Sequence, residues 1–313
     1  MEIGRLMNIT DDFIEMTLPL LDDYEGQVVA TLISAKTNRE NQKSVLYLHG
    51  YVDYFFQVHL AEAFVNKGYN FYALDLRKHG RSLLPHQHKN YYRNIEEFYE
   101  EITLSIKMIK EESSEALYLL GHSTGGLIAS NYMLNGELRS KVQGLMLNSP
   151  FVEIRFPRIL RRPLFFLSTI VSSVRPYAKF PEMFSPIYGK SAHKDFDGEW
   201  DYNLEWKPIK GFDLYHAWMC AIISAQDRLR HAKIDVPILV MHAERSLNMS
   251  TYTQEAKTAD TVLVVEDMQK VGAQLGGDVT LLSVKDGMHD LFLSKYEVRT
   301  FVLSEMLAWL ERH

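Results

Sequence analysis

The sequence lacks the features that mark secreted and membrane-spanning proteins. Its one cysteine, Cys220, cannot form an intramolecular disulfide, so a reducing compartment is expected. No apolar stretch reaches the roughly 18 to 20 residues that cross a bilayer, and the N-terminus has neither the basic start nor the apolar core of a signal peptide. We therefore expect a cytoplasmic protein without stable membrane insertion.

Signatures of cofactor and nucleic-acid binding are also missing. The sequence contains no G-x-G-x-x-G or P-loop pattern, and its histidines are not closely spaced with carboxylates or cysteines as in a metal site. The 313 residues carry a net charge of −6, from 40 acidic and 34 basic side chains. This balance gives no reason to expect a nucleic-acid partner. We expect no cofactor, no metal and a small-molecule substrate.

Short apolar runs alternate with segments of helical spacing along most of the chain. This pattern is typical of a mostly parallel sheet, here of about eight strands, with helices on both faces. No helix separates the first two strands, so an antiparallel hairpin is expected at the sheet edge. The expected strands cover residues 13–18, 28–34, 45–49, 71–76, 117–121, 142–147, 238–242 and 279–284.

Residues 151–229 interrupt this alternation and contain six of the ten prolines and three of the four tryptophans. We interpret this inserted segment as a lid that divides the core into residues 1–150 and 230–313. Within it, the apolar stretch 163–174 follows Arg158, Arg161 and Arg162. This stretch is expected either to cover a pocket or to lie on a lipid surface as a basic amphipathic helix, so a transient lipid contact stays open.

The run LGHSTGG, residues 120–126, places Ser123 between a buried strand and a helix-like segment. A sharp strand-to-helix turn needs small residues nearby, and Gly121, Gly125 and Gly126 supply them. Such an elbow exposes the Ser123 hydroxyl and directs the backbone N–H of Thr124 towards a developing negative oxygen. The alternative is an ordinary helix-capping serine in a glycine-rich loop.

Other motifs in the chain favour the catalytic interpretation. A strand that ends in His49-Gly50 precedes Tyr51, whose N–H can supply a second oxyanion donor. A serine hydroxyl is a poor nucleophile, so it needs a base to take its proton and a carboxylate to hold that base. His289 follows the last expected strand in the run Gly287-Met288-His289-Asp290.

These motifs together resemble the α/β-hydrolase superfamily, in the branch that contains monoacylglycerol lipases and serine-aminopeptidase-like hydrolases. The resemblance covers nearly the whole chain from residue 28 and is weakest in the inserted segment. It implies the chain order serine, acid, histidine, with His289 as the base. His49, His79, His122 and His242 are interpreted as residues that structure loops or line the site.

The resemblance leaves several carboxylates as candidates for the acid. Glu244 comes just after the strand 238–242, where this fold usually places the acid. Asp260 lies 29 residues before His289 (289 − 260) and is followed by a helix and a strand that lead to the histidine. We predict Asp260, with residues 245–259 as an insertion in the acid loop. Asp267 and Asp286 are lesser candidates.

The expected function is hydrolysis of carboxylic esters, such as short-to-medium acyl esters or monoacylglycerol-like lipids, through an acyl-enzyme on Ser123. An aminopeptidase or amidase on the same triad is the alternative. It would need a carboxylate in the inserted segment to bind a substrate amine. The candidates for that carboxylate are Glu182, Asp195, Asp197, Glu199, Asp201 and Glu205. A ligand-binding protein on a hydrolase scaffold is a more distant alternative.

Overall fold

A computed structural model describes residues 13–38, 43–112, 115–183 and 185–313. Its centre is an eight-stranded sheet in the order β1-β2-β4-β3-β5-β6-β9-β10. The strands are β1 (Ile14–Pro19), β2 (Val29–Ala35), β3 (Ser44–Leu48), β4 (Asn70–Asp75), β5 (Leu117–His122), β6 (Gly144–Asn148), β9 (Ile238–Ala243) and β10 (Val279–Val284). Each expected strand is present, and the predicted α/β-hydrolase fold is confirmed.

Strand direction follows the connections between the strands. β2 runs antiparallel to both β1 and β4, whereas β4, β3, β5, β6, β9 and β10 are parallel. The predicted antiparallel hairpin is therefore correct. The central strands β3 to β6 are buried on both faces, which explains their unbroken apolar sequences. The carboxyl ends of β5, β6, β9 and β10 share one edge, where a site can form.

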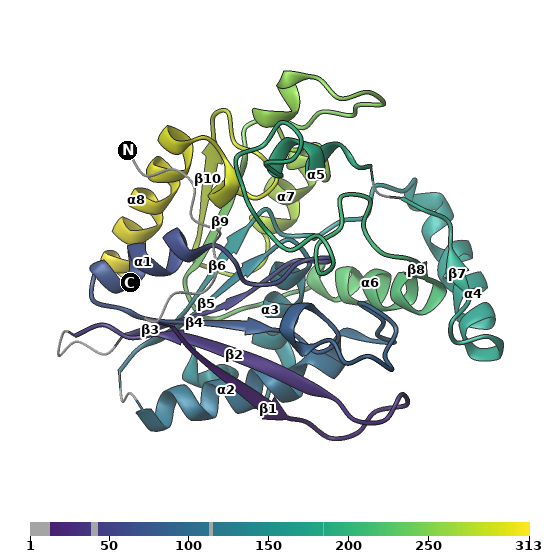
Figure 1. The fold of residues 1–313 in the computed structure, drawn as a ribbon, viewed down its shortest axis with the longest axis horizontal. Coiled ribbons are helices and arrows are strands. Elements are labelled where there is room, and N and C mark those ends of the chain that lie inside the picture. Colours follow the sequence, from purple (N-terminus) through teal and green to yellow (C-terminus); the bar gives the residue numbers. More distant parts are fainter. Residues whose placement is uncertain (1–12, 39–42, 113–114, 184) are drawn as a thin grey trace.

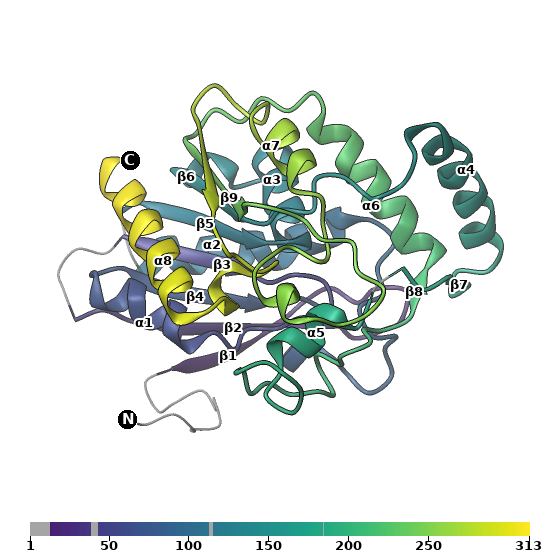
Figure 2. The ribbon, with the colours of Figure 1, turned by 90° about the horizontal axis from the view of Figure 1, so that it is seen from above.

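Helices cover both faces of the sheet, as Figures 1 and 2 show. On one face α1 and α8 pack against Val45, Tyr47 and Met146. On the other face α2, α3, α6 and α7 pack against Leu46, Leu48 and other strand residues that alternate with the first set. The helices of the described chain are α1 (Val58–Asn66), α2 (Tyr99–Glu112), α3 (Thr124–Asn135), α4 (Arg158–Val174), α5 (Ile187–Ala192), α6 (His216–Leu229), α7 (Val265–Gly272) and α8 (Tyr296–Arg312).

The inserted segment connects β6 to β9 and contains α4, β7 (Lys179–Phe180), α5, β8 (Leu214–Tyr215) and α6. α6 packs against α3 and α4, so the end of the segment belongs to the helical layer. In both ribbon views α4 lies at the end of the molecule far from α1 and α8. No helix of the described residues is long and apolar enough to span a bilayer.

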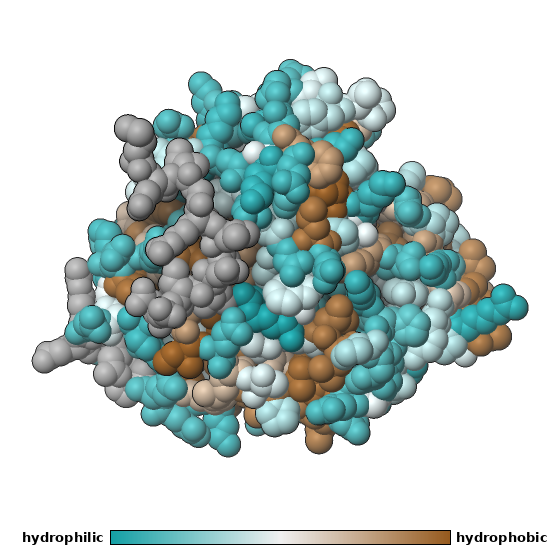
Figure 3. All heavy atoms as spheres, viewed as in Figure 1, coloured by the Kyte–Doolittle hydropathy of each residue, from teal (hydrophilic) through white to brown (hydrophobic). Residues whose placement is uncertain are grey.

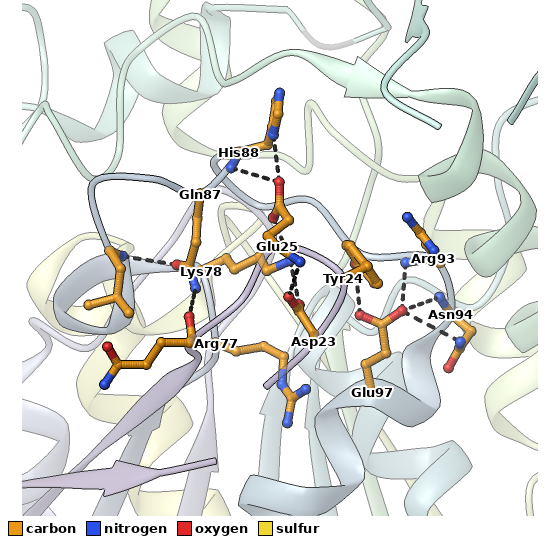
Figure 4. Close-up of polar contacts among 12 residues, drawn as sticks. Asp23, Tyr24, Glu25, Arg77, Lys78, Gln87, His88, Arg93, Asn94 and Glu97 are labelled. Carbon is orange, nitrogen blue, oxygen red and sulfur yellow. Dashed lines mark hydrogen bonds and ion pairs between the residues drawn. The ribbon is translucent and has the colours of Figure 1, made fainter. Parts of the chain in front are cut away.

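A buried ion cluster joins the β1–β2 turn to the loop after β4 (Figure 4). The Lys78 ammonium lies 2.6 Å from Asp23 Oδ2 and 2.6 Å from Glu25 Oε2, and it also lies over the Tyr24 ring. Two carboxylates around one ammonium offset the cost of removing that charge from water. The cluster therefore fixes the edge hairpin to the loop 77–97, which continues into α2.

Candidate active site

Ser123 occupies the sharp turn between β5 and α3. Its backbone has φ 51° and ψ −116°, a conformation that non-glycine residues rarely adopt. Helix α3 approaches β3 so closely that a Cβ on Gly125 would lie 2.3 Å from the Leu48 and His49 carbonyl oxygens. Ser123 makes no side-chain cap hydrogen bond to α3. The structure therefore favours the elbow interpretation over the capping one.

The Ser123 hydroxyl meets His289, which lies in the loop after β10. His289 Nε2 is 3.0 Å from Ser123 Oγ, and His289 Nδ1 is 2.8 Å from Asp260 Oδ2. All three side chains are largely buried. This geometry lets Nε2 take the serine proton while the carboxylate holds the N–H at Nδ1.

Asp260 reaches this position because residues 246–259 form a loop after β9 whose two ends lie side by side. The Asp260 amide donates to the Arg245 carbonyl at 3.0 Å, and the Leu247 amide donates to the Asp260 carbonyl at 2.8 Å. Asp260 thus lies next to the end of β9, where the acid of this fold is expected. The Glu244 side chain is exposed, as is that of Asp286, and Asp267 lies in the first turn of α7.

Hydrogen bonds hold the Asp260 carboxylate in its charged form. Its Oδ1 accepts from the Val262 and Leu263 amides at 2.8 and 2.7 Å. Burial favours the neutral acid, but the His289 imidazole and these two amides outweigh it, so the pKa of Asp260 lies below its usual value. An ionised Asp260 can then stabilise the imidazolium that forms when His289 takes a proton.

Tyr51 and Thr124, the predicted oxyanion donors, line the same cavity as Ser123 and His289. A Cβ on Gly50 would lie 3.2 Å from Ser123 Cβ, so the turn after β3 passes directly beside the elbow. Thr124 is the first residue of α3, where helical N–H groups point outward and the helix dipole is positive. The roles of both N–H groups stay predictions.

A cavity of about 260 Å³ opens onto Ser123 and His289, while Asp260 lies buried behind the histidine. Part of its wall is apolar and comes from Phe151, Ile154, Met183, Ile209, Val262 and Leu263. None of the α4 residues whose side chains the structure describes, 159–174, lines it. The expectation that residues 163–174 cover the pocket is therefore wrong: α4 packs on α6 and points its other apolar face outward.

A family model described as serine aminopeptidase, S33, matches residues 39–295, most of the chain. The chain belongs to this family. No curated protein matches this chain.

Solved hydrolase structures share this S33-family chain's fold. A monoacylglycerol lipase from Paleococcus ferrophilus has a TM-score of 0.66 at 20% identity, with 89% of this chain and 97% of that chain covered. A soluble variant of Saccharomyces cerevisiae monoglyceride lipase, in complex with a substrate analogue, has a TM-score of 0.68 at 17% identity, with 98% of each chain covered. A thermostable Bacillus coagulans carboxyl esterase, in complex with glycerol, has a TM-score of 0.70 at 14% identity, with coverages of 96% and 99%. The S33-family chain is a hydrolase, lipase- and esterase-like in fold.

Sequence reasoning missed a buried network beside Ser123 and His289 in this S33-family hydrolase. Asn148, at the end of β6, accepts from the Ser123 amide through its carbonyl at 3.0 Å and donates from its side chain to Asp290 Oδ1 at 2.8 Å. Gln57 donates to the other Asp290 oxygen at 3.2 Å. The network ties the serine turn to the histidine loop. In the sequence, the signal for this network is the polar residue Asn148 at the end of an apolar strand.

One group of side chains in the described chain has metal-ligand chemistry: Asp53, His122 and Asp290, with one ligand atom from each within 4.8 Å of the others. Each already has a protein partner. Asp53 pairs with Lys207 at 2.7 Å, His122 Nδ1 lies 3.2 Å from the Asn148 carbonyl, and Asp290 is bound by Asn148 and Gln57. These contacts fit a protein network better than an ion site in this S33-family chain.

Proposed function

We propose that the protein hydrolyses carboxylic esters through an acyl-enzyme on Ser123. The observation that carries this proposal is the continuous chain of contacts from Ser123 Oγ through His289 to Asp260, which opens at Ser123 and His289 onto a partly apolar cavity.

We also propose that the inserted segment, residues 151–229, acts as the lid of a two-part core. We further propose that the protein works in the cytoplasm.

The proposed reaction has two halves. Ser123 Oγ attacks the ester carbonyl as His289 Nε2 takes its proton, and the N–H groups of Tyr51 and Thr124 bind the oxyanion. His289 then protonates the leaving alcohol, and the acyl group remains on Ser123. Water, deprotonated by His289, attacks the acyl-enzyme and releases the acid. Each oxyanion donor is expected to lower the barrier by roughly 3 kcal/mol.

The cavity favours ester substrates over peptides with a free amine. An aminopeptidase would need a carboxylate available to the substrate ammonium, and none of the six candidates in the inserted segment lines the cavity. The acidic side chains that do line it are paired: Asp53 with Lys207, and Glu153 with Arg161 and Arg230. An amine would have to lose its water without gaining a free partner charge.

Short-to-medium acyl esters and monoacylglycerols are the proposed substrates. An acyl chain that enters the apolar part of the cavity gains about 0.8 kcal/mol for each methylene it buries, so kcat/KM should rise roughly fourfold per carbon until the cavity is full. The test is kcat/KM along an acetyl-to-dodecanoyl p-nitrophenyl series beside alanyl, leucyl and prolyl anilides. A preference for any anilide would support the peptidase alternative. Binding without turnover would support the ligand-binding one.

The outer face of α4 supports a transient contact with lipid. Ile159, Phe166 and Val174 are 83%, 68% and 76% exposed, and Leu160, Leu167 and Ile170 extend the same apolar surface. Figure 3 shows apolar side chains at this end of the molecule. Residues 154–181 contain six basic residues and no aspartate or glutamate, although the whole chain is acidic. Such a helix suits an anionic membrane surface.

A further inference from the structure

The turn after β3, residues 51–53, has an unfavourable backbone that its surroundings must hold. Val52 has φ 51°, in the left-handed region. A β-branched residue rarely adopts this conformation, which persists only where neighbouring structure fixes it. Tyr51, the proposed oxyanion donor, is the residue before it. The orientation of that N–H therefore depends on the contacts that hold this turn.

The core holds the far end of the turn. Asp75, at the end of β4, accepts from the Phe55 amide at 2.7 Å. Arg81 donates to the Phe55 carbonyl at 3.0 Å and to Asp75 Oδ2 at 2.8 Å. These bonds fix residue 55, which lies two residues beyond the turn.

The inserted segment holds the turn itself, on both sides of Val52. The Tyr51 hydroxyl donates to the Asp213 carbonyl at 3.2 Å, and the Tyr51 ring lies 5.3 Å from that of Trp218. The Asp53 carboxylate lies 2.7 Å from the Lys207 ammonium. Residues 203–218 therefore contact the residue before Val52 and the residue after it.

Of these contacts, the Lys207–Asp53 ion pair is the one between two buried charges. The Asp53 side chain is 1% exposed and that of Lys207 8%. The ammonium lies 5.6 to 5.7 Å from the centroids of the Phe56, Tyr188 and Tyr202 rings. Asp53 Oδ1 also accepts from the Tyr54 amide at 3.0 Å. Removing one member of such a pair leaves a buried charge without its counter-ion, which the turn would have to rearrange to solvate.

We propose that Lys207 is a positioning residue: acting through Asp53, it holds the turn 51–53 so that the Tyr51 N–H faces the oxyanion. The inference rests on the proposed function. It makes the inserted segment part of the catalytic apparatus, because displacement of residues 203–218 from the core would also release the oxyanion donor.

Two simpler roles for Lys207 predict different results. If the pair only fastens the inserted segment to the core, its loss lowers the melting temperature and leaves kcat unchanged. If the ammonium contacts the substrate directly, its loss raises KM. A positioning role lowers kcat and weakens binding of compounds that place a negative oxygen in the oxyanion site.

The test compares Lys207→Met, Lys207→Arg and the double variant Asp53→Asn/Lys207→Met. The double variant leaves no unpaired buried charge, so it keeps the test valid if Lys207→Met fails to fold. Lys194→Met is the matched control, because Lys194 pairs with Asp201 in the same segment but is exposed. For each protein, kcat and KM on one ester are measured. Two inhibition constants are measured as well: Ki for a trifluoromethyl ketone, which forms an oxyanion on Ser123, and Ki for its methyl ketone analogue. The melting temperature Tm of each protein is also measured.

We expect Lys207→Met and the double variant to lose about ten- to a hundredfold in kcat, with KM changed less than about threefold. Ki for the trifluoromethyl ketone should rise by the same factor as kcat falls, while Ki for the methyl ketone stays constant. Lys207→Arg should recover most of the activity, and Lys194→Met should match the wild type. An unchanged kcat, or a rise in KM alone, would overturn the positioning role. A wild-type protein that neither turns over an ester nor binds the trifluoromethyl ketone would contradict the proposed function as well.

Discussion

His289 Nε2 lies 3.0 Å from Ser123 Oγ, although the two residues are 166 positions apart in the chain. The sheet explains this proximity, because β5, β6, β9 and β10 are consecutive neighbours and their carboxyl ends share one edge. Ser123 leaves β5 at that edge, and His289 follows β10. Asp260 reaches the same edge by the detour of residues 246–259 after β9.

Replacing the orienting carboxylate should cost most of the activity. Asp260→Asn leaves the size of the side chain unchanged but removes the charge that stabilises the imidazolium and the acceptor that selects its tautomer. We expect kcat to fall on the order of 10⁴-fold. Glu244→Gln is the control, because Glu244 is exposed, and its kcat should stay near the wild-type value. The opposite ranking of the two variants would move the acid to Glu244.

The close approach of α3 to β3 predicts that the elbow cannot accept a methyl group at residue 125. Gly125→Ala would place a Cβ 2.3 Å from two backbone carbonyl oxygens, whereas a Cβ on Gly277 meets no atom within 4 Å. We expect Gly125→Ala to lower the free energy of unfolding by about 1–3 kcal/mol or more and to reduce kcat. Gly277→Ala should do neither. Urea unfolding and ester turnover measure both effects, and equal behaviour of the two variants would refute the packing argument.

Buried neutral histidines should make the fold sensitive to mild acid. Burial and the neighbouring His49 lower the pKa of His79 to about 3, and burial and His289 lower that of His122 to about 3. In the unfolded chain histidine takes up a proton below about pH 6.5, whereas these two stay neutral in the folded protein. The free energy of unfolding should therefore fall by about 2 kcal/mol per group between pH 7 and pH 5.

His79→Asn provides the comparison for this pH dependence. An asparagine retains a donor near the position of Nδ1, which lies 2.7 Å from the Arg77 carbonyl oxygen, but it does not titrate. Its unfolding free energy should depend less steeply on pH than that of the wild type. Equal stability of the wild type at pH 7 and pH 5 would contradict the prediction.

The exposed face of α4 should bind anionic vesicles. We expect sedimentation with phosphatidylglycerol-containing vesicles, weaker binding to pure phosphatidylcholine, and loss of binding at high salt. Phe166→Ser with Ile170→Ser should reduce the affinity about tenfold or more. Phe301→Ser is the control, because Phe301 is another exposed aromatic residue but lies on α8, at the far end of the molecule. Equal affinity for both kinds of vesicle would contradict the proposed preference of the α4 surface for anionic lipid.

The sequence predicted the fold because its signals were local. The buried strands are continuous apolar runs, and the glycines around Ser123 are required by the elbow. The predicted meeting of Ser123, His289 and Asp260 matches the observed distances, and their catalytic roles stay predictions.

Features that depend on long-range contacts escaped prediction. The amphipathic pattern of α4 indicated a helix but not which face would pack. The Lys207–Asp53 pair joins residues 154 positions apart (207 − 53), and no local pattern marks either of them.

Labelling of the protein with a fluorophosphonate tests the central claim most directly, because the reagent reacts selectively with an activated serine. Mass spectrometry of the wild type should show one adduct, on the peptide that contains Ser123. Ser123→Ala should show no adduct and no ester hydrolysis, while its circular dichroism and melting temperature stay unchanged. Ser172→Ala is the control variant, and the reagent should label it as fully as the wild type. An adduct on another serine, or turnover that survives in Ser123→Ala, would contradict the assignment of Ser123 as the nucleophile.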